Sequence, residues 1–191
     1  MKIKIAEYAG YCYGVERALK MASQAANHNQ APKPIFSLGP IIHNPQVVQS
    51  LENEGIHHIS HLGEIKQGTI IIRSHGMAPK IIAEAKKKGI QVIDATCPFV
   101  KKAQHCASKL ISEGYRLIII GEQAHPEVIG ILAHAGDNAL VVEKASDLQF
   151  LTEGERVGVV VQTTQQVENL KKIVSELLPK VVELKVFNTI C

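Results

Sequence analysis

The chemistry-bearing residues that stand out first are cysteines placed where a strand turns into a helix. Cys97 follows the β-branched pair Val92-Ile93 and precedes Pro98, a residue suited to the first turn of a helix. Cys12 likewise precedes an amphipathic segment. The unpaired N–H groups and the dipole at a helix N-terminus stabilise a thiolate. These positions therefore favour reactive or metal-binding thiolates over buried structural cysteines.

An internal repeat links the cysteines to histidines. Cys12 stands 31 positions before His43, and Cys97 stands 28 positions before His125. In both copies a glycine lies four residues before the histidine. The first copy then continues to a strand that ends in polar residues, among them His75. The repeat predicts two α/β lobes of similar size.

The second copy continues to a strand that ends at Thr163 and Thr164, and the chain then reaches Cys191. Cys191 lies 94 positions after Cys97, against 85 positions between Cys12 and Cys97, and it also follows a strand-like run. It is typical of the opening cysteine of a third repeat. We expect lobes at 1–96 and 97–191, with an intact protein that continues through one more lobe.

The apolar periodicity predicts strands that alternate with helices. Expected strands are 2–6, 34–38, 69–73, 91–94, 116–120, 139–142, 157–161 and 181–186. Expected helices are 14–27, 45–54, 79–88, 98–113, 126–134 and 165–178. This alternation predicts βαβ units and mostly parallel sheets, with ligands bound at the carboxyl ends of the strands.

Three cysteines at equivalent strand ends can converge on one point. Three thiolates without the spacing of a zinc site suit an iron–sulfur cluster that leaves one iron open. The alternative is that each is an ordinary buried residue, because free cysteine is among the most buried residue types. Ligation is favoured for Cys12, Cys97 and, less strongly, Cys191. For Cys106, on the apolar face of the helix after Cys97, the core interpretation is favoured.

His43, His75 and His125 each lie beside a predicted helix N-terminus. Imidazoles and helix N-termini together make an anion site suited to a diphosphate. A single such histidine is more often a cap or loop residue, but three in matched positions favour function. Arg73 is a possible phosphate partner, but an arginine at a strand end is more often a surface residue. Arg73 is therefore not among the predicted site residues.

Glu127 lies two residues after His125, in the first turn of a predicted helix. Such a carboxylate usually stabilises the helix dipole. Beside a cluster and an anion site it is also a candidate proton donor, because desolvation would raise its pKa. The Thr163 and Thr164 hydroxyls are candidates for a substrate contact or a proton relay.

Composition excludes several other classes of protein. The formal charge is only +3 and aromatic residues make up 4% of the chain, which argues against nucleic-acid binding. The N-terminus lacks the apolar core of a signal peptide, and no apolar run approaches the ~18 residues that span a bilayer. We expect a cytoplasmic protein with reduced cysteines and no membrane partner.

Several motifs resemble those of the 4-hydroxy-3-methylbut-2-enyl diphosphate reductase family, which ends the methylerythritol phosphate route to isoprenoids. They are Gly10-Tyr11-Cys12-Tyr13-Gly14-Val15-Glu16-Arg17-Ala18, Ile42-His43-Asn44, Ser74-His75-Gly76, Asp94-Ala95-Thr96-Cys97-Pro98, His125-Pro126-Glu127-Val128, Gln162-Thr163-Thr164 and Asn188-Thr189-Ile190-Cys191. The resemblance covers the whole chain in order. It implies a three-lobed α/β enzyme with a central [4Fe-4S] cluster.

The resemblance also implies roles for individual residues. Cys12, Cys97 and Cys191 would hold the cluster, and His43, His75 and His125 would hold the diphosphate. Glu127 would donate a proton, and Thr163 would contact the substrate or assist the relay. Electrons from ferredoxin or flavodoxin would remove the substrate hydroxyl as water, which gives isopentenyl and dimethylallyl diphosphates.

One departure from the family pattern bears on activity. The family's third lobe supplies a Ser-x-Asn element and a further serine that bind diphosphate, and this sequence contains neither. We therefore expect little or no turnover from the 191-residue chain alone. Two alternatives stay open: a non-catalytic module that binds a metal or a diphosphate, and a zinc-dependent hydrolase with Glu127 as its base. The histidines lack H-E-x-x-H spacing, which argues against the hydrolase.

Overall fold

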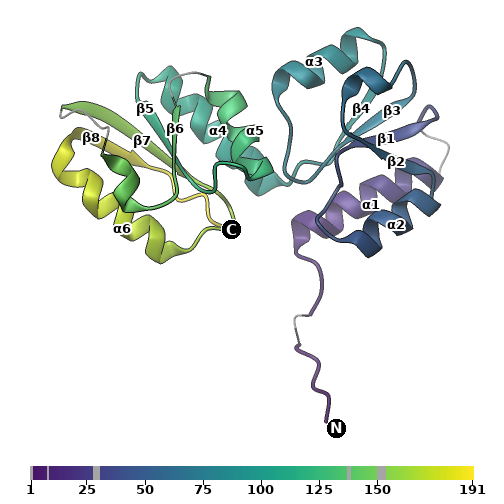
Figure 1. Ribbon diagram of the computed structural model, residues 1–191, viewed down its shortest axis with the longest axis horizontal. Coiled ribbons are helices and arrows are strands. Elements are labelled where there is room, and N and C mark those ends of the chain that lie inside the picture. The colour runs from purple at the N-terminus through teal and green to yellow at the C-terminus, as the bar shows by residue number, and fades with distance from the viewer. Residues whose placement is uncertain (1, 8, 28–30, 137–138, 150–153) are drawn as a thin grey trace.

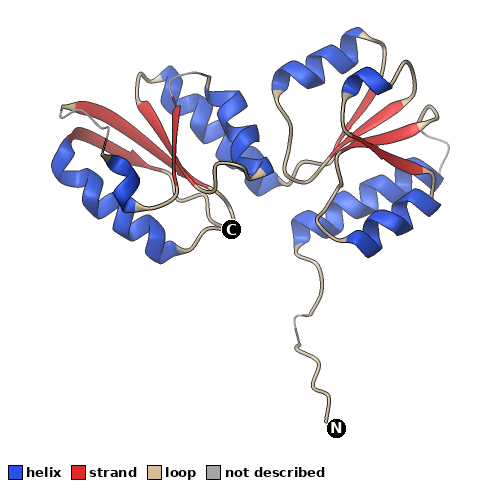
Figure 2. Ribbon diagram, viewed as in Figure 1, coloured by secondary structure: helices blue, strands red, loops and turns tan. Residues whose placement is uncertain are grey.

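The computed structural model describes residues 2–7, 9–27, 31–136, 139–149 and 154–191. Each of its two sheets has four parallel strands with helices on both faces (Figures 1 and 2). The strand orders are β2-β1-β3-β4 and β6-β5-β7-β8, so the second sheet repeats the order of the first. The predicted α/β architecture with parallel sheets is confirmed.

The first lobe runs from α1 to β4. Its elements are α1 (Tyr13–Asn27), β1 (Ile35–Leu38), α2 (Pro45–Asn53), β2 (Ile56–Ile59), β3 (Thr69–Ile72), α3 (Pro79–Lys87) and β4 (Gln91–Asp94), with a 3₁₀ turn at Leu62–Glu64. All four residues of the central strand β3 are buried, as expected for a parallel strand covered on both faces. One core lies between the sheet and α1 and α2, and a second lies beneath α3.

The second lobe runs from α4 to β8. Its elements are α4 (Pro98–Ser112), β5 (Arg116–Ile120), α5 (Pro126–Ala135), β6 (Ala139–Val142), β7 (Glu155–Val161), α6 (Val167–Leu177) and β8 (Val181–Val186), with 3₁₀ turns at Ala145–Leu148 and Leu178–Lys180. Helices α4 and α5 cover one face of the sheet, and α6 covers the other. The same layered plan therefore occurs twice along the chain.

Two strand assignments differ from the prediction. Residues 2–6 form no strand in the part of the chain that the structure describes, and Ile3 and Ile5 are 76% and 85% exposed. Alternation predicts which side chains share a face, but a strand also needs a neighbour for its hydrogen bonds. Strand β2 was missed because its sequence, Ile-His-His-Ile, has an apolar residue only at each end; both histidines are exposed.

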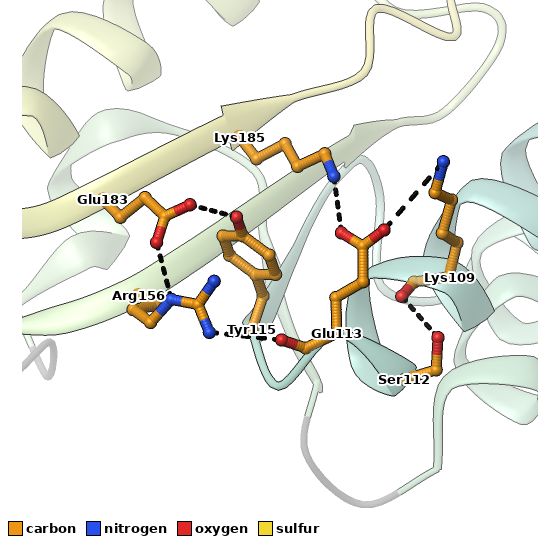
Figure 3. A network of polar contacts seen from close by, with 7 residues as sticks. All are labelled: Lys109, Ser112, Glu113, Tyr115, Arg156, Glu183 and Lys185. Carbon is orange, nitrogen blue, oxygen red and sulfur yellow. Dashed lines mark hydrogen bonds and ion pairs between the residues drawn. The ribbon is translucent and has the colours of Figure 1, made fainter.

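A polar network fixes the edge strand β8 (Figure 3). The Tyr115 hydroxyl donates to the Glu183 carboxylate, and Arg156 Nε donates to the same carboxylate at 2.6 Å. The Arg156 guanidinium lies 4.4 Å from the centre of the Tyr115 ring. Lys185 pairs with Glu113 at the end of α4. These contacts hold β8 against β7 and so determine where residues 187–191 leave the sheet.

Among the described residues, no helix is both long enough and apolar enough to cross a membrane.

Candidate functional site

Cys97 and Cys191 occupy equivalent places in the two lobes. Each follows the fourth strand of its sheet, and each is bonded to the segment after the third strand. The Cys97 N–H donates to the Ser74 carbonyl at 2.9 Å, and the Cys191 N–H donates to the Thr163 carbonyl at 3.0 Å. The buried Thr189 hydroxyl adds two hydrogen bonds to the third strand: it accepts from the Val161 N–H and donates to the Val161 carbonyl.

Helix α1, which begins one residue after Cys12, packs directly on Cys97. A Cβ atom at Gly14 would lie 2.5 Å from Cys97 Sγ and 3.1 Å from Cys97 Cβ. Arg17, one turn further along α1, donates from Nη1 to the Thr96 carbonyl at 3.1 Å. The first turn of α1 and the first turn of α4 therefore meet at the Cys97 sulfur.

The three predicted ligand cysteines are free thiols. Cys12 and Cys191 are exposed and Cys97 is half-buried. Burial raises the pKa of the Cys191 thiol, and the charges of Cys97 and Cys12 raise it further, so the three sulfurs interact electrostatically. Cys106 is buried in the core under α4, as predicted, and burial raises the pKa of its thiol.

In the described parts of the chain, no group of three His, Cys, Asp or Glu residues is placed to hold a single metal ion. An iron–sulfur cluster does not require such a group, because its thiolates are distributed over separate irons and do not converge on one ion. The absent side chain at Gly14 lets α1 pack directly against the Cys97 sulfur. Three free cysteine thiols that interact electrostatically are a donor set that fits a cysteine-held cluster.

The three predicted histidines come together from both lobes. Their rings lie on loops after β1, β3 and β5, with 4.8 Å between the centroids of His43 and His75 and 5.6 Å between those of His75 and His125. Asn44, next to His43, caps α2 by accepting from the N–H groups of Gln46 and Val47 at 3.0 and 3.2 Å. The histidine cluster therefore lies between helix N-termini.

His125 and His75 differ in their hydrogen bonds. His125 caps α5: its Nδ1 accepts from the Glu127 N–H at 3.2 Å, so the neutral ring carries its proton on Nε2. His75 Nδ1 is buried and has no hydrogen-bond partner among the residues that the structure describes. The pKa of His75 is lowered to about 4, chiefly by burial and also by the charges of His43, Arg73 and His125. His75 is neutral at physiological pH.

Glu127 and Thr163 form a buried pair in the second lobe. The Glu127 side chain accepts from the Thr163 N–H and from the Thr163 hydroxyl, both at 2.7 Å. Glu127 is only 2% exposed. Burial raises the pKa of its carboxyl, while the two bonds from Thr163 and the charge of His125 oppose the rise. A carboxyl in this setting can hold a proton at a higher pH than an exposed one.

The two threonines at the end of β7 separate into different environments. Thr163 is buried on Glu127, whereas Thr164 is exposed and its hydroxyl accepts from Gln162 Nε2 at 2.8 Å. The structure therefore connects Thr163, and not Thr164, to the carboxyl group.

Arg73 is a site neighbour that our sequence interpretation excluded. It is half-buried, and its charge acts on His75 two residues along the chain. Within the described parts of the chain, its buried Nε has no hydrogen-bond partner. The only available signal was its closeness in sequence to His75, and spacing alone cannot show burial.

Comparison with known proteins supports the resemblance of the motifs. The family model described as LytB protein matches residues 3–191. The chain belongs to this family. The 4-hydroxy-3-methylbut-2-enyl diphosphate reductase of Pelobacter propionicus is 48% identical over the whole chain, which covers 67% of that relative. The reductase of Geobacter metallireducens is 46% identical with the same coverage.

Two solved structures share the fold of this family member. One, of (E)-4-hydroxy-3-methyl-but-2-enyl diphosphate reductase, superposes with a TM-score of 0.88 at 46% identity and covers 99% of this chain and 68% of that one. The reductase from Plasmodium falciparum superposes with a TM-score of 0.87 at 31% identity and covers 97% of this chain and 59% of that one. The chain thus spans about two thirds of the length of the two bacterial reductases and of the first solved structure, and less of the Plasmodium falciparum enzyme.

Proposed function

We propose that this chain carries the cluster-binding and diphosphate-binding lobes of a reductase that converts 4-hydroxy-3-methylbut-2-enyl diphosphate into isopentenyl and dimethylallyl diphosphates. The observation that supports this most is one juxtaposition. The buried Glu127–Thr163 pair joins a histidine cluster at His125, and the Thr163 carbonyl holds Cys191. An acid, an anion site and a thiol are therefore connected through adjacent hydrogen bonds.

In this proposal the histidines bind the diphosphate. His75 is neutral at physiological pH, so it binds phosphate oxygens as an N–H donor rather than as a cation. The N-termini of α2 and α5 add the positive ends of their helix dipoles beside His43 and His125. This places the anionic end of the substrate at the junction of the lobes.

Glu127 is the proposed proton donor. Its pKa is raised by burial, which keeps a proton available, and Thr163 orients the carboxyl through two hydrogen bonds. The loss of the substrate hydroxyl as water consumes a proton, and Glu127 would deliver it either directly or through the Thr163 hydroxyl.

Cys12, Cys97 and Cys191 are the proposed ligands of a [4Fe-4S] cluster. When bound, such a cluster supplies the electrons that the dehydroxylation requires, and we propose ferredoxin or flavodoxin as their source. The chain's own contribution is to hold the three sulfurs at the carboxyl ends of the strands. Backbone bonds fix two of these positions, and the packing of α1 on Cys97 brings the first turn after Cys12 beside them.

A second candidate is a unit that binds the cluster and the diphosphate but does not turn over. The chain spans 67% of the length of the relative it matches, so binding and turnover need separate tests. Clear product formation by the 191-residue chain, reconstituted and chemically reduced, would exclude this second candidate and support the reductase.

The test of the metal site is anaerobic reconstitution with iron and sulfide, followed by iron and sulfide analysis. The native chain should bind about four iron atoms and absorb near ~400 nm. Single changes of Cys12, Cys97 or Cys191 to Ser should reduce the iron content to below about one atom per chain. Cys106→Ser is the matched control, because this thiol lies in the core. Equal loss in Cys106→Ser, or no loss in the other three, would overturn the ligand assignment.

A further inference from the structure

Arg73 is a half-buried cation without an acidic partner. No ion pair involves it among the described residues, and its Nε is buried without a hydrogen-bond partner. The guanidinium packs closely against Gly39, where a Cβ atom would lie 3.0 Å from Nη1. Gly39 has φ +72°, a conformation that favours glycine. The Gly39 backbone therefore packs closely on a guanidinium that no described acidic side chain pairs with.

The same guanidinium lines a hollow at the junction of the lobes. The hollow has a volume of about 370 Å³, and its walls include Gly76, Pro126 and Ser60. Gly76 directly follows His75 and Pro126 directly follows His125, so two walls of the hollow are chain neighbours of clustered histidines, whose own side chains do not line it. Arg73 thus stands at the edge of the proposed diphosphate site rather than on an outer surface.

The histidine cluster needs a source of fixed positive charge. The rings of His43 and His125 lie 4.8 and 5.6 Å from the ring of His75. His75, the middle ring, is neutral at physiological pH. A diphosphate brings several negative charges, and neutral N–H donors and helix dipoles compensate only part of them. An arginine stays protonated whatever its surroundings.

We propose that Arg73 is the charged member of the diphosphate site, supplying from beside His75 the permanent positive charge that the neutral imidazole lacks. This inference rests on the proposed function, because it assumes that the histidine cluster binds a diphosphate. It assigns a binding role to a residue that the strand-end pattern had suggested to be a simple surface arginine.

The test is the affinity for inorganic diphosphate, measured by calorimetry at pH 8 and low ionic strength. Arg73→Gln should weaken binding by about tenfold or more, as expected for loss of a charge-assisted contact. Arg73→Lys keeps the charge and should stay within about threefold of the native affinity. Lys66→Gln removes the same charge from an exposed loop and should change affinity by less than about twofold.

The choice of pH separates charge from protonation. Removing Arg73 also removes one cause of the low pKa of His75, so that pKa should rise towards its ordinary value of 6.5. At pH 8 His75 is neutral in every variant, so a change in affinity reports Arg73 itself. An NMR titration of His75 should show the pKa higher in Arg73→Gln than in Arg73→Lys. A purely structural role would give the two variants equal titrations.

The possible failures are distinguishable. If the native chain does not bind diphosphate, both the proposed function and the role of Arg73 are overturned. If the native chain binds but Arg73→Gln binds within about twofold of it, only the role of Arg73 is overturned. Should Arg73→Gln fail to fold, the native chain still decides the matter, because it has only four arginines. Saturating diphosphate should shift the Arg73 Nε–H resonance, and an unshifted resonance would overturn the inference.

Discussion

The two lobes use one backbone arrangement to support two different side-chain chemistries. In each lobe the third strand is followed by a hydroxyl residue, Ser74 or Thr163, whose carbonyl accepts the N–H of the next cysteine, at 2.9 Å for Cys97 and 3.0 Å for Cys191. The strand orders are the same as well. The scaffold that places the sulfur is therefore common to both copies.

The hydroxyl groups at this equivalent position differ in what they bind. Ser74 Oγ donates to the Ile41 carbonyl at 3.1 Å, a partner that cannot change charge. Thr163 Oγ1 donates to the Glu127 carboxylate at 2.7 Å, a partner that can. The following residue also differs: His75 points into the histidine cluster, whereas Thr164 is exposed. The first lobe therefore contributes two of the three clustered histidines, and the second lobe contributes the third together with the buried Glu127 carboxyl.

The largest expected effect comes from removing the acid of the second lobe. Glu127→Gln keeps the size of the side chain but cannot donate the proton, so whatever product formation the reconstituted chain supports should fall by at least about 100-fold. Inorganic diphosphate should still bind within about threefold of the native affinity, because the histidines remain. His75→Ala should show the opposite pattern, because its main effect is on the affinity for inorganic diphosphate, which should be weaker. Both are measured anaerobically, with protein in excess so that slow turnover is counted.

The matched control for this pair is the hydroxyl of the first lobe. Ser74→Ala removes a bond to a neutral carbonyl, and the Ser74 N–H still contacts that carbonyl at 3.4 Å. Its effect on product formation should be less than about tenfold, well below that of Glu127→Gln. If Ser74→Ala and Glu127→Gln reduce turnover equally, Glu127 has no special role as the proton donor.

The helices and strands of both lobes could be predicted because the spacing of apolar residues, and the Gly and Pro residues that end an element, are local signals. The helix expected at 14–27 is α1 at Tyr13–Asn27, and the strand expected at 116–120 is β5 at Arg116–Ile120. The strand expected at 2–6 does not form in the described residues, because alternation carries no information about a pairing partner. Local pattern identifies elements, and pairing depends on the rest of the fold.

The site residues could be chosen by type and spacing, but their contacts could not. Glu127 and Thr163 lie 36 positions apart, and no local pattern predicts that they share two hydrogen bonds. The distinction between Thr163 and Thr164 likewise depends on how β7 meets α5. Arg73 was excluded because burial is a property of the folded chain. The sequence alone identifies candidates, and packing decides what each of them touches.

The residue two positions after the first cysteine of each lobe differs between the lobes. After Cys12 it is Gly14, which packs on Cys97, and after Cys97 it is Phe99, which is 44% exposed. Gly14→Ala places a methyl group 2.5 Å from the Cys97 sulfur, so α1 or Cys97 must move. We expect a loss of about 1–3 kcal/mol in the free energy of unfolding and poor retention of iron. Phe99→Ala should change both quantities little.

A steric control separates crowding at Cys97 from a general effect of alanine. Gly63 has open space where its Cβ would be and no positive φ, so Gly63→Ala should leave stability and iron content close to native. Thermal melts and iron analysis measure the two outcomes, with about 2–4 °C in Tm expected for each kcal/mol. Native iron content in Gly14→Ala would show that the α1–Cys97 contact does not position the ligands.

The smallest expected effect is a pair of opposite pH dependences. The pKa of His75 is about 4 in the fold against an ordinary 6.5, so the unfolded chain binds this proton first as pH falls. The stability that His75 contributes is complete above pH 6.5 and is lost between 6.5 and about 4. Glu127 has a pKa raised above its ordinary 4.5, so its contribution is complete below pH 4.5 and is lost as pH rises through the raised value.

Variants of the two residues should therefore change the slope of stability against pH in opposite directions. Between pH 6.5 and 5 the free energy of unfolding should fall by about 1–2 kcal/mol less in His75→Asn than in the native chain, which corresponds to a few degrees in Tm. Glu127→Gln should gain stability relative to the native chain as pH rises from 4.5 to 8. His105→Asn is the control, because His105 is exposed and its variant should keep the native slope. If His75→Asn also keeps that slope, His75 is not held neutral by the fold, and the first lobe would present a protonated cluster to its anion.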